Sequence, residues 1–157
     1  MILIISSSKK GLFIMTVLEK IEYMHKVQKG EISIFDDNGF DNADFEKYHS
    51  ILDEFRFHPD TLDCDALLQI MRMFDDNCFE LSWQLILAKI VVLNCEYYGK
   101  ERFGFYLDNL NEVPKNGRYH GWETTIKMMS NELNDIFKEA LKDKSEEVKN
   151  LVHNILK

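Results

Sequence analysis

The chain contains little proline and cysteine, and each shortage excludes a class of protein. Only Pro59 and Pro114 occur in 157 residues, and no long stretch alternates in the way that β-strands do, which argues against a β-rich fold. The three cysteines, Cys64, Cys78 and Cys95, are odd in number and widely spaced. They therefore form neither a disulfide scaffold nor a CxxC metal half-site, and we predict small buried residues in a reducing cytoplasm.

A long apolar run is also missing. Even Phe79 to Leu93 contains Gln84 and Lys89, so no stretch reaches the roughly 20 uncharged residues that a membrane-spanning helix requires. In the N-terminal segment MILIISSSKKGLFIM the lysines follow the apolar residues and no small-residue cleavage site is present, so we predict that it is not a signal peptide. Because a helix fits from Met15 onward, residues 1–14 are either an irregular N-terminal extension or sequence upstream of the usual start.

Motifs for catalysis or metal binding are absent as well. In IFDDNGFDNADF, placing Gly39 at the sixth position of a calcium loop puts Ile34 first and Phe45 twelfth, where an acidic ligand is required, so the EF-hand pattern fails. The glycines are too scattered for a phosphate-binding loop. The histidines form no HExxH motif: His25, His49, His58, His120 and His153. We therefore predict no enzymatic activity, no cofactor and no metal site.

The net charge of −8 is concentrated in one part of the chain. Residues 1–29 have a net charge of +3 and residues 81–157 carry eleven charges of each sign. Residues 30–80 contain fourteen acidic residues and three Lys or Arg, a net charge of −11. Such a segment repels nucleic acid and attracts a basic partner.

Hydrophobic residues recur at helical spacing along most of the chain, which predicts a single all-α domain over residues 1–157. We expect about six to seven helices in antiparallel pairs, arranged as a HEAT-like stack or an irregular bundle. Asn42 and Ser145 are the expected helix caps, a further helix is expected to begin near Thr61 to Asp63, and Gly30 and Gly99 are the expected helix ends. One amphipathic stripe runs unbroken from residue 126 to 141, and the segment 79–98 is apolar on most sides, as in a buried central helix.

The block Asp75-Asp76-Asn77 interrupts the most apolar region of the chain. It has two interpretations: it ends one helix and caps the next, or its charge forms part of a surface that binds a positive partner. The second interpretation, combined with the acidic loop between the first two helices, gives a predicted partner-binding surface made of Asp36, Asp37, Asp41, Asp44, Asp75, Asp76 and Glu80.

Several segments resemble one protein family: CDALLQIMRMFDDNCFELSWQLILAKI, GWETTIKMMSN and SEEVKNLVHNIL, with Phe137 and Leu141 between the last two. Together they are similar to the helical immunity proteins of bacterial polymorphic and contact-dependent growth-inhibition toxin systems, of the immunity protein 30 type. The resemblance covers about Asp63 to Leu156. It departs from the family where Gly121 stands before Trp122, since the family has a proline beside this helix.

The resemblance implies a cytoplasmic protein that neutralises a cognate toxin, and the acidic segment suits a basic nuclease domain. One alternative is a HEAT-like scaffold or adaptor without enzymatic activity. Another is a metal-dependent helical hydrolase that uses His49, His58 and nearby acids.

Overall fold

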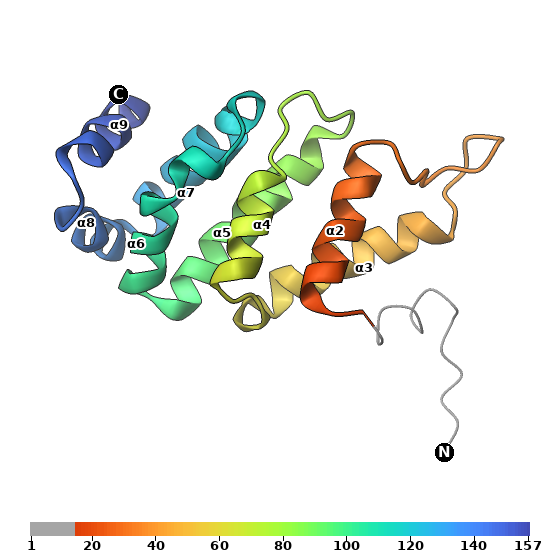
Figure 1. The fold of residues 1–157 in the computed structure, drawn as a ribbon, viewed down its shortest axis with the longest axis horizontal. Coiled ribbons are helices and arrows are strands. Elements are labelled where there is room, and N and C mark those ends of the chain that lie inside the picture. Colours follow the sequence, from red (N-terminus) through yellow and green to blue (C-terminus); the bar gives the residue numbers. More distant parts are fainter. Residues whose placement is uncertain (1–14) are drawn as a thin grey trace, which may run out of the picture.

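The computed structural model describes residues 15–157, whose helices pack in two layers (Figure 1). In one layer α2, α4, α6 and α8 contact each other in chain order, and in the other α3, α5, α7 and α9 do the same. The bounds of these helices are α2 (Val17–Gln28), α3 (Ala43–Phe57), α4 (Cys64–Arg72), α5 (Leu81–Tyr98), α6 (Lys100–Asp108), α7 (Thr125–Glu132), α8 (Asn134–Lys142) and α9 (Glu146–Leu156). The predicted all-α class is confirmed for the described residues.

Side-chain caps start the helices where the sequence predicts them. The side chain of Asn42 accepts hydrogen bonds from the first N–H groups of α3, and Asp63 accepts one from Ala66 N at the start of α4. Ser145 does the same for α9. Each cap satisfies a helix donor that would otherwise lack a partner. At the other end of α5, Gly99 has φ +85°, a conformation that side chains with a Cβ rarely adopt.

Helix α5 is the centre of the fold, as its apolar circumference predicts. It contacts α3, α4, α6 and α7, and Leu87, Ile90 and Val91 are fully buried in it. Buried hydrophobic side chains form one cluster that extends from Ile21 in α2 to Val152 in α9. A single continuous core therefore joins both ends of the described chain.

The predicted number of six to seven helices is wrong, because the described residues form eight. The stripe expected to be one helix is divided at Leu133, whose φ of −132° and ψ of 39° are not helical. The break lets α8 turn into the layer of α6, where Phe137 packs edge-on against Phe103 with ring centroids 6.5 Å apart. Tertiary packing has overridden a pattern that is continuous in sequence.

Short helical turns fill several of the connections between the helices. The 3-10 turns are η1 (Pro59–Thr61), η2 (Leu110–Glu112) and η3 (Lys115–Gly117), and η4 (Tyr119–Thr124) is a π-helical turn that leads into α7. Within residues 15–157, no helix combines the length and the apolar character needed to cross a membrane. The expectation for residues 1–14 lies outside the described residues.

Candidate protein-binding surface

A narrow loop between α2 and α3 projects from the N-terminal half of the molecule (Figure 1). Phe35 and Asp41 form an antiparallel bridge at its neck, and the turn between them is closed by a 2.7 Å hydrogen bond from Asp36 N to Phe40 O. The carboxylate of Asp36 accepts the N–H groups of Asn38 at 2.8 Å and Phe40 at 3.0 Å. The side chain of Asp36 therefore stabilises the turn through hydrogen bonds to its backbone.

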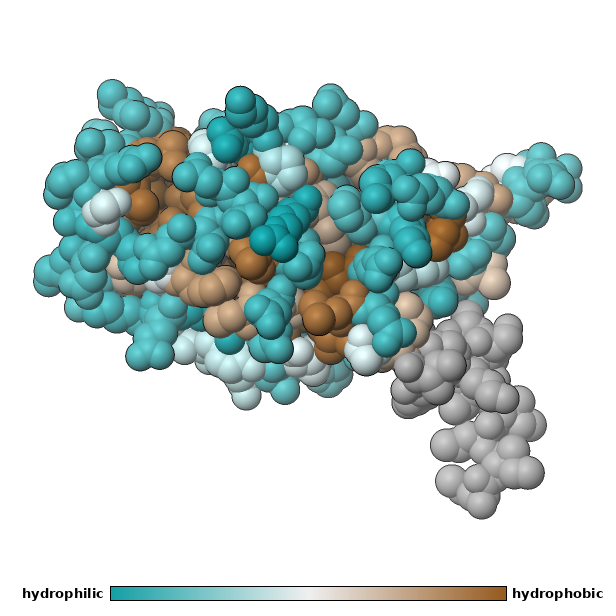
Figure 2. All heavy atoms as spheres, in the orientation of Figure 1, coloured by the Kyte–Doolittle hydropathy of each residue, from teal (hydrophilic) through white to brown (hydrophobic). Residues whose placement is uncertain are grey.

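The tip of this loop combines negative charge with exposed aromatic rings. Asp36, Asp37 and Asp41 are exposed, and within residues 15–157 none of them forms an ion pair. Phe40 is 70% exposed and Phe35 42%. We call these five residues the loop surface, whose hydrophilic tip projects at one end of Figure 2. Exposed aromatic rings are common in surfaces that bind other proteins, and the exposed carboxylates beside them give this surface a negative charge.

Asp44 lies below the loop surface, in the first turn of α3, and is half-buried. Its Oδ1 accepts a 2.7 Å hydrogen bond from the hydroxyl of Tyr23 in α2. Burial raises the pKa of Tyr23, and the hydrogen bond to Asp44 raises it further. Asp44 therefore joins α2 to α3 and adds less free charge to the surface than the loop acids do.

The adjacent acids Asp75 and Asp76 are also engaged by the protein itself. Asp75 accepts the N–H of Asn77 at 2.9 Å and the side-chain amide of Asn116 at 3.1 Å. Asp76 accepts the N–H groups of Tyr119 at 3.0 Å and His120 at 3.1 Å, and its Oδ1 lies 2.6 Å from His120 Nδ1. Together they clamp the segment that begins the π-helical turn η4 against the end of α4.

Glu80 remains exposed at the start of α5, where its Oε1 accepts a hydrogen bond from the hydroxyl of Ser82 at 2.8 Å. Beside it, Phe79 is 60% exposed and Leu81 49% exposed. A second, smaller combination of acid and apolar side chains therefore lies at this loop.

An aromatic row made of Phe45, His49, Trp83 and Phe79 joins the base of the loop surface to Glu80. Ring centroids are 4.4 Å apart for Phe45 and His49, 6.1 Å for His49 and Trp83, and 5.2 Å for Trp83 and Phe79. Trp83 is buried against Tyr48, whereas Phe79 is largely exposed. The packed rings therefore connect the base of the loop surface to the region around Glu80.

The charge of Asp75 also reaches the end of α2. The pKa of His25 is lowered, because burial disfavours the imidazolium and the charge of Lys29 adds to the effect. The negative charges of Glu31 and Asp75 oppose this shift. Acidic side chains from two separate connections therefore contribute to the field at this end of the helices.

The histidines proposed for a hydrolase are far apart. His49 belongs to the aromatic row, whereas His58 is exposed at the C-terminal end of α3, nine residues further on and so roughly 13 Å along the helix. Among residues 15–157, no three His, Cys, Asp or Glu side chains gather closely enough to hold a metal ion.

The seven predicted residues thus fall into two groups. The exposed group is Asp36, Asp37, Asp41 and Glu80, of which Asp36 and Glu80 accept hydrogen bonds only from residues of their own loop or helix start. The half-buried group is Asp44, Asp75 and Asp76, whose carboxylates accept hydrogen bonds from distant segments of the chain. The prediction missed the exposed rings of Phe40 and Phe79. A signal for Phe40 was present, since a phenylalanine that follows Asp-Asp-Asn-Gly in a turn is poorly placed to reach a core.

No known protein family, curated protein or solved structure matches this chain.

Proposed function

We propose that this protein is an immunity protein that binds a cognate toxin, a nuclease with a basic substrate cleft, and neutralises it in the cytoplasm. The observation that carries the proposal is the loop surface: three exposed acids without ion pairs among residues 15–157, and two exposed phenylalanines, on a turn held by its own hydrogen bonds. Inhibition by stoichiometric binding requires no catalytic residue.

Charge complementarity explains why a nuclease suits this surface. A cleft that binds RNA or DNA phosphates is lined with basic side chains, so acidic side chains can compete for the same site. The resemblance of the segments from Asp63 to Leu156 to helical immunity proteins supports the same class of partner.

The acids and the rings have different tasks in this proposal. Long-range attraction between opposite charges raises the association rate, by about 10- to 1000-fold in favourable cases. Tight binding depends on rings that lose their water in a pocket of the partner, for which Phe40 and Phe79 are the best placed. Because hydrogen bonds fix the turn before binding, little entropy is lost when it docks.

The alternative is a HEAT-like scaffold or adaptor without enzymatic activity. The observation that favours it is the two-layer order of the helices, in which each helix contacts the next helix of its own layer. Gene neighbourhood separates the two functions, because an immunity protein should be encoded directly beside a toxin.

The test is co-expression of this protein with the toxin encoded upstream, scored for rescue of growth, followed by binding kinetics with the purified toxin domain. The variant D37K/D41K reverses two exposed charges of the loop surface and leaves Asp36 in place. The matched control D135K/E147K makes the same change in net charge on α8 and α9, where both side chains are exposed and neither forms an ion pair among residues 15–157.

We expect D37K/D41K to slow association by about tenfold or more at low salt, to reduce the salt dependence and to weaken rescue. Phe40→Ala should mainly speed dissociation, whereas Phe57→Ala, which truncates a phenylalanine that is 67% exposed at the other end of α3, should not. If both charge-reversed proteins bind the toxin like the unaltered protein, the loop surface is not the binding site.

A further inference from the structure

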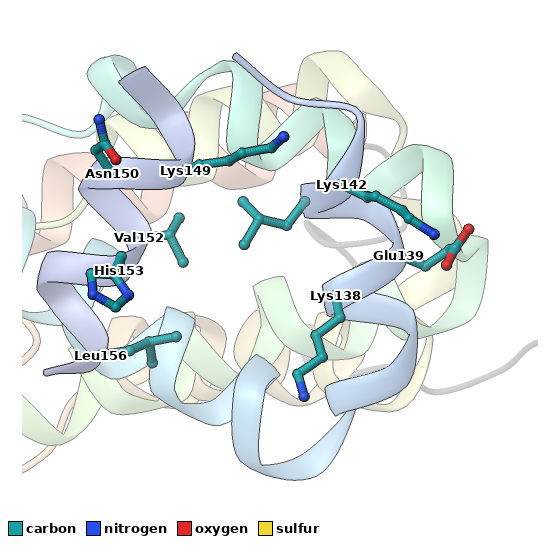
Figure 3. Close-up of a pocket in the computed structure, with 9 residues that line it drawn as sticks. Lys138, Glu139, Lys142, Lys149, Asn150, Val152, His153 and Leu156 are labelled. Atoms are coloured by element: carbon teal, nitrogen blue, oxygen red, sulfur yellow. The ribbon is translucent and has the colours of Figure 1, made fainter. Parts of the chain in front are cut away.

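A groove runs between α8 and α9 (Figure 3). In Figure 1 these two helices lie at the opposite end of the molecule from the loop between α2 and α3. Its volume is about 550 Å³, and it is lined by Lys138, Glu139, Leu141, Lys142, Lys149, Asn150, Val152, His153 and Leu156. In Figure 2 hydrophobic atoms gather in a hollow at this end, with hydrophilic atoms around them.

The floor of the groove is apolar and is made by one face of each helix. Leu141 comes from α8, and Val152 and Leu156 come from α9, four residues apart and therefore on the same face. Val152 is buried, whereas Leu156 remains 39% exposed. The space between two packed helices matches the ridge of a third helix, as in helix-in-groove recognition.

The rim of the groove is basic. Lys138 and Lys142 lie one turn apart on α8, and within the described part of the chain neither forms an ion pair. Lys149 stands on α9, with Glu146 at 3.7 Å as an exposed partner. The one acid of the lining, Glu139, points outward in Figure 3, where Lys100 of α6 lies 3.8 Å from it. The lining of the groove therefore carries three lysines against one glutamate.

We propose that this groove binds an acidic amphipathic helix of another protein, with leucine-like side chains on the floor and carboxylates against Lys138, Lys142 and Lys149. Charge complementarity selects this occupant, because a neutral helix would leave the lysines without partners and a basic helix would be repelled. The site is separate from the loop surface, so the protein can hold a toxin at one end and an acidic helix at the other.

The test uses a synthetic peptide of about 16 residues, long enough to span the groove as a helix, with a leucine stripe flanked by glutamates. A control peptide keeps the leucines and replaces each glutamate by lysine. Binding to the full-length protein is measured by fluorescence anisotropy, and the site is mapped by changes in backbone amide NMR signals.

We expect saturable binding of the acidic peptide only, with amide shifts concentrated in residues 138–156 and not in 33–42. The variant K138Q/K142Q/K149Q should weaken binding of the acidic peptide by about tenfold, because three exposed ion pairs with the peptide are lost and each is individually weak. The control K26Q/K115Q/K127Q removes the same charge from exposed positions elsewhere and should bind like the unaltered protein. Leu156→Asn should also weaken binding, because it makes the floor polar.

Three results would overturn the proposal. One is equal binding of the acidic and basic peptides, and another is equal loss of affinity in both triple-lysine variants. The third is self-association of the protein, detected by sedimentation, that the groove variant abolishes, because the occupant is then a second copy of this chain. None of these results depends on a toxin, so the proposed immunity function stands or fails by its own experiment.

Discussion

At the scale of single residues, acids with the same charge have different surroundings in this protein. The Asp76 carboxylate accepts two backbone N–H groups and lies against the His120 ring, whereas Asp37 is exposed and forms no ion pair within residues 15–157. A carboxylate that accepts hydrogen bonds from backbone N–H groups of a distant segment stabilises the fold, and one in solvent contributes mainly to the long-range field.

The two carboxylates should therefore separate stability from binding. We expect Asp76→Ala to lower the free energy of unfolding by about 2–3 kcal/mol, because the N–H groups that it accepts lose a charged partner. Asp37→Ala should change it by less than about 0.5 kcal/mol. Urea denaturation followed by circular dichroism measures both, and equal effects would contradict the structural role of Asp76.

Gly117 lies where the backbone of another segment leaves no room for a side chain. A Cβ at this position would lie 2.1 Å from the carbonyl oxygen of Phe74, and backbone cannot move aside as a flexible side chain can. We expect Gly117→Ala to destabilise the protein by about 1–3 kcal/mol, measured by thermal unfolding.

The matched control for Gly117 is Gly104→Ala in α6, where the nearest atom is the Nζ of Lys144 at 3.2 Å, the far end of a long side chain rather than backbone. Alanine is favoured over glycine inside a helix by about 1 kcal/mol, so this variant should be neutral or slightly more stable. A loss of stability at Gly104 as large as that at Gly117 would show that the contact with Phe74 is not the cause.

At the scale of the elements, the end of α2 couples stability to pH through His25. Because its pKa in the folded protein is lowered, the unfolded chain binds more protons as the pH falls below the ordinary histidine value of about 6.5. The contribution of His25 therefore favours folding above that pH and is lost as the solution becomes more acidic.

We expect His25→Gln to reduce the loss of stability between neutral pH and pH 5, because glutamine cannot take up the proton. The measurement is the denaturation midpoint of both proteins across this range. Comparison at neutral pH, where the imidazole is mostly uncharged, gives the effect of the substitution on packing alone. If the denaturation midpoints of the two proteins fall in parallel as the pH is lowered, His25 is not the source of the pH dependence.

At the scale of the whole molecule, the two-layer order means that each helix depends mainly on its neighbours along the stack. Phe137 joins α8 to α6, is 1% exposed and packs against Phe103, so its loss should loosen the C-terminal end first.

We expect Phe137→Ala to cost about 3–5 kcal/mol and to reduce hydrogen-exchange protection in residues 134–156 more than in α2 to α5. Ile136→Ala is the control, because Ile136 is 37% exposed and adjacent in sequence. A uniform loss of protection along the chain would show that the molecule opens as one unit.

The fold class and most helix boundaries could be predicted from local signals. Asn42, Asp63 and Ser145 act through hydrogen bonds within three residues of themselves, so the sequence alone identifies them. The division at Leu133 could not be predicted in this way. The apolar stripe continues through it, and the break arises from the contact of α8 with α6.

Local sequence properties and tertiary contacts also contributed differently to the acidic segment and to the basic groove. The sequence by itself determined that the acid excess lies in residues 30–80 and that a turn-rich loop carries part of it, since charge and turn preference are properties of residue types. Only the tertiary structure decided that Asp76 meets His120, 44 residues away, and that α8 and α9 enclose a basic groove. Both depend on contacts between distant segments, which form only when the apolar faces of the helices are buried together.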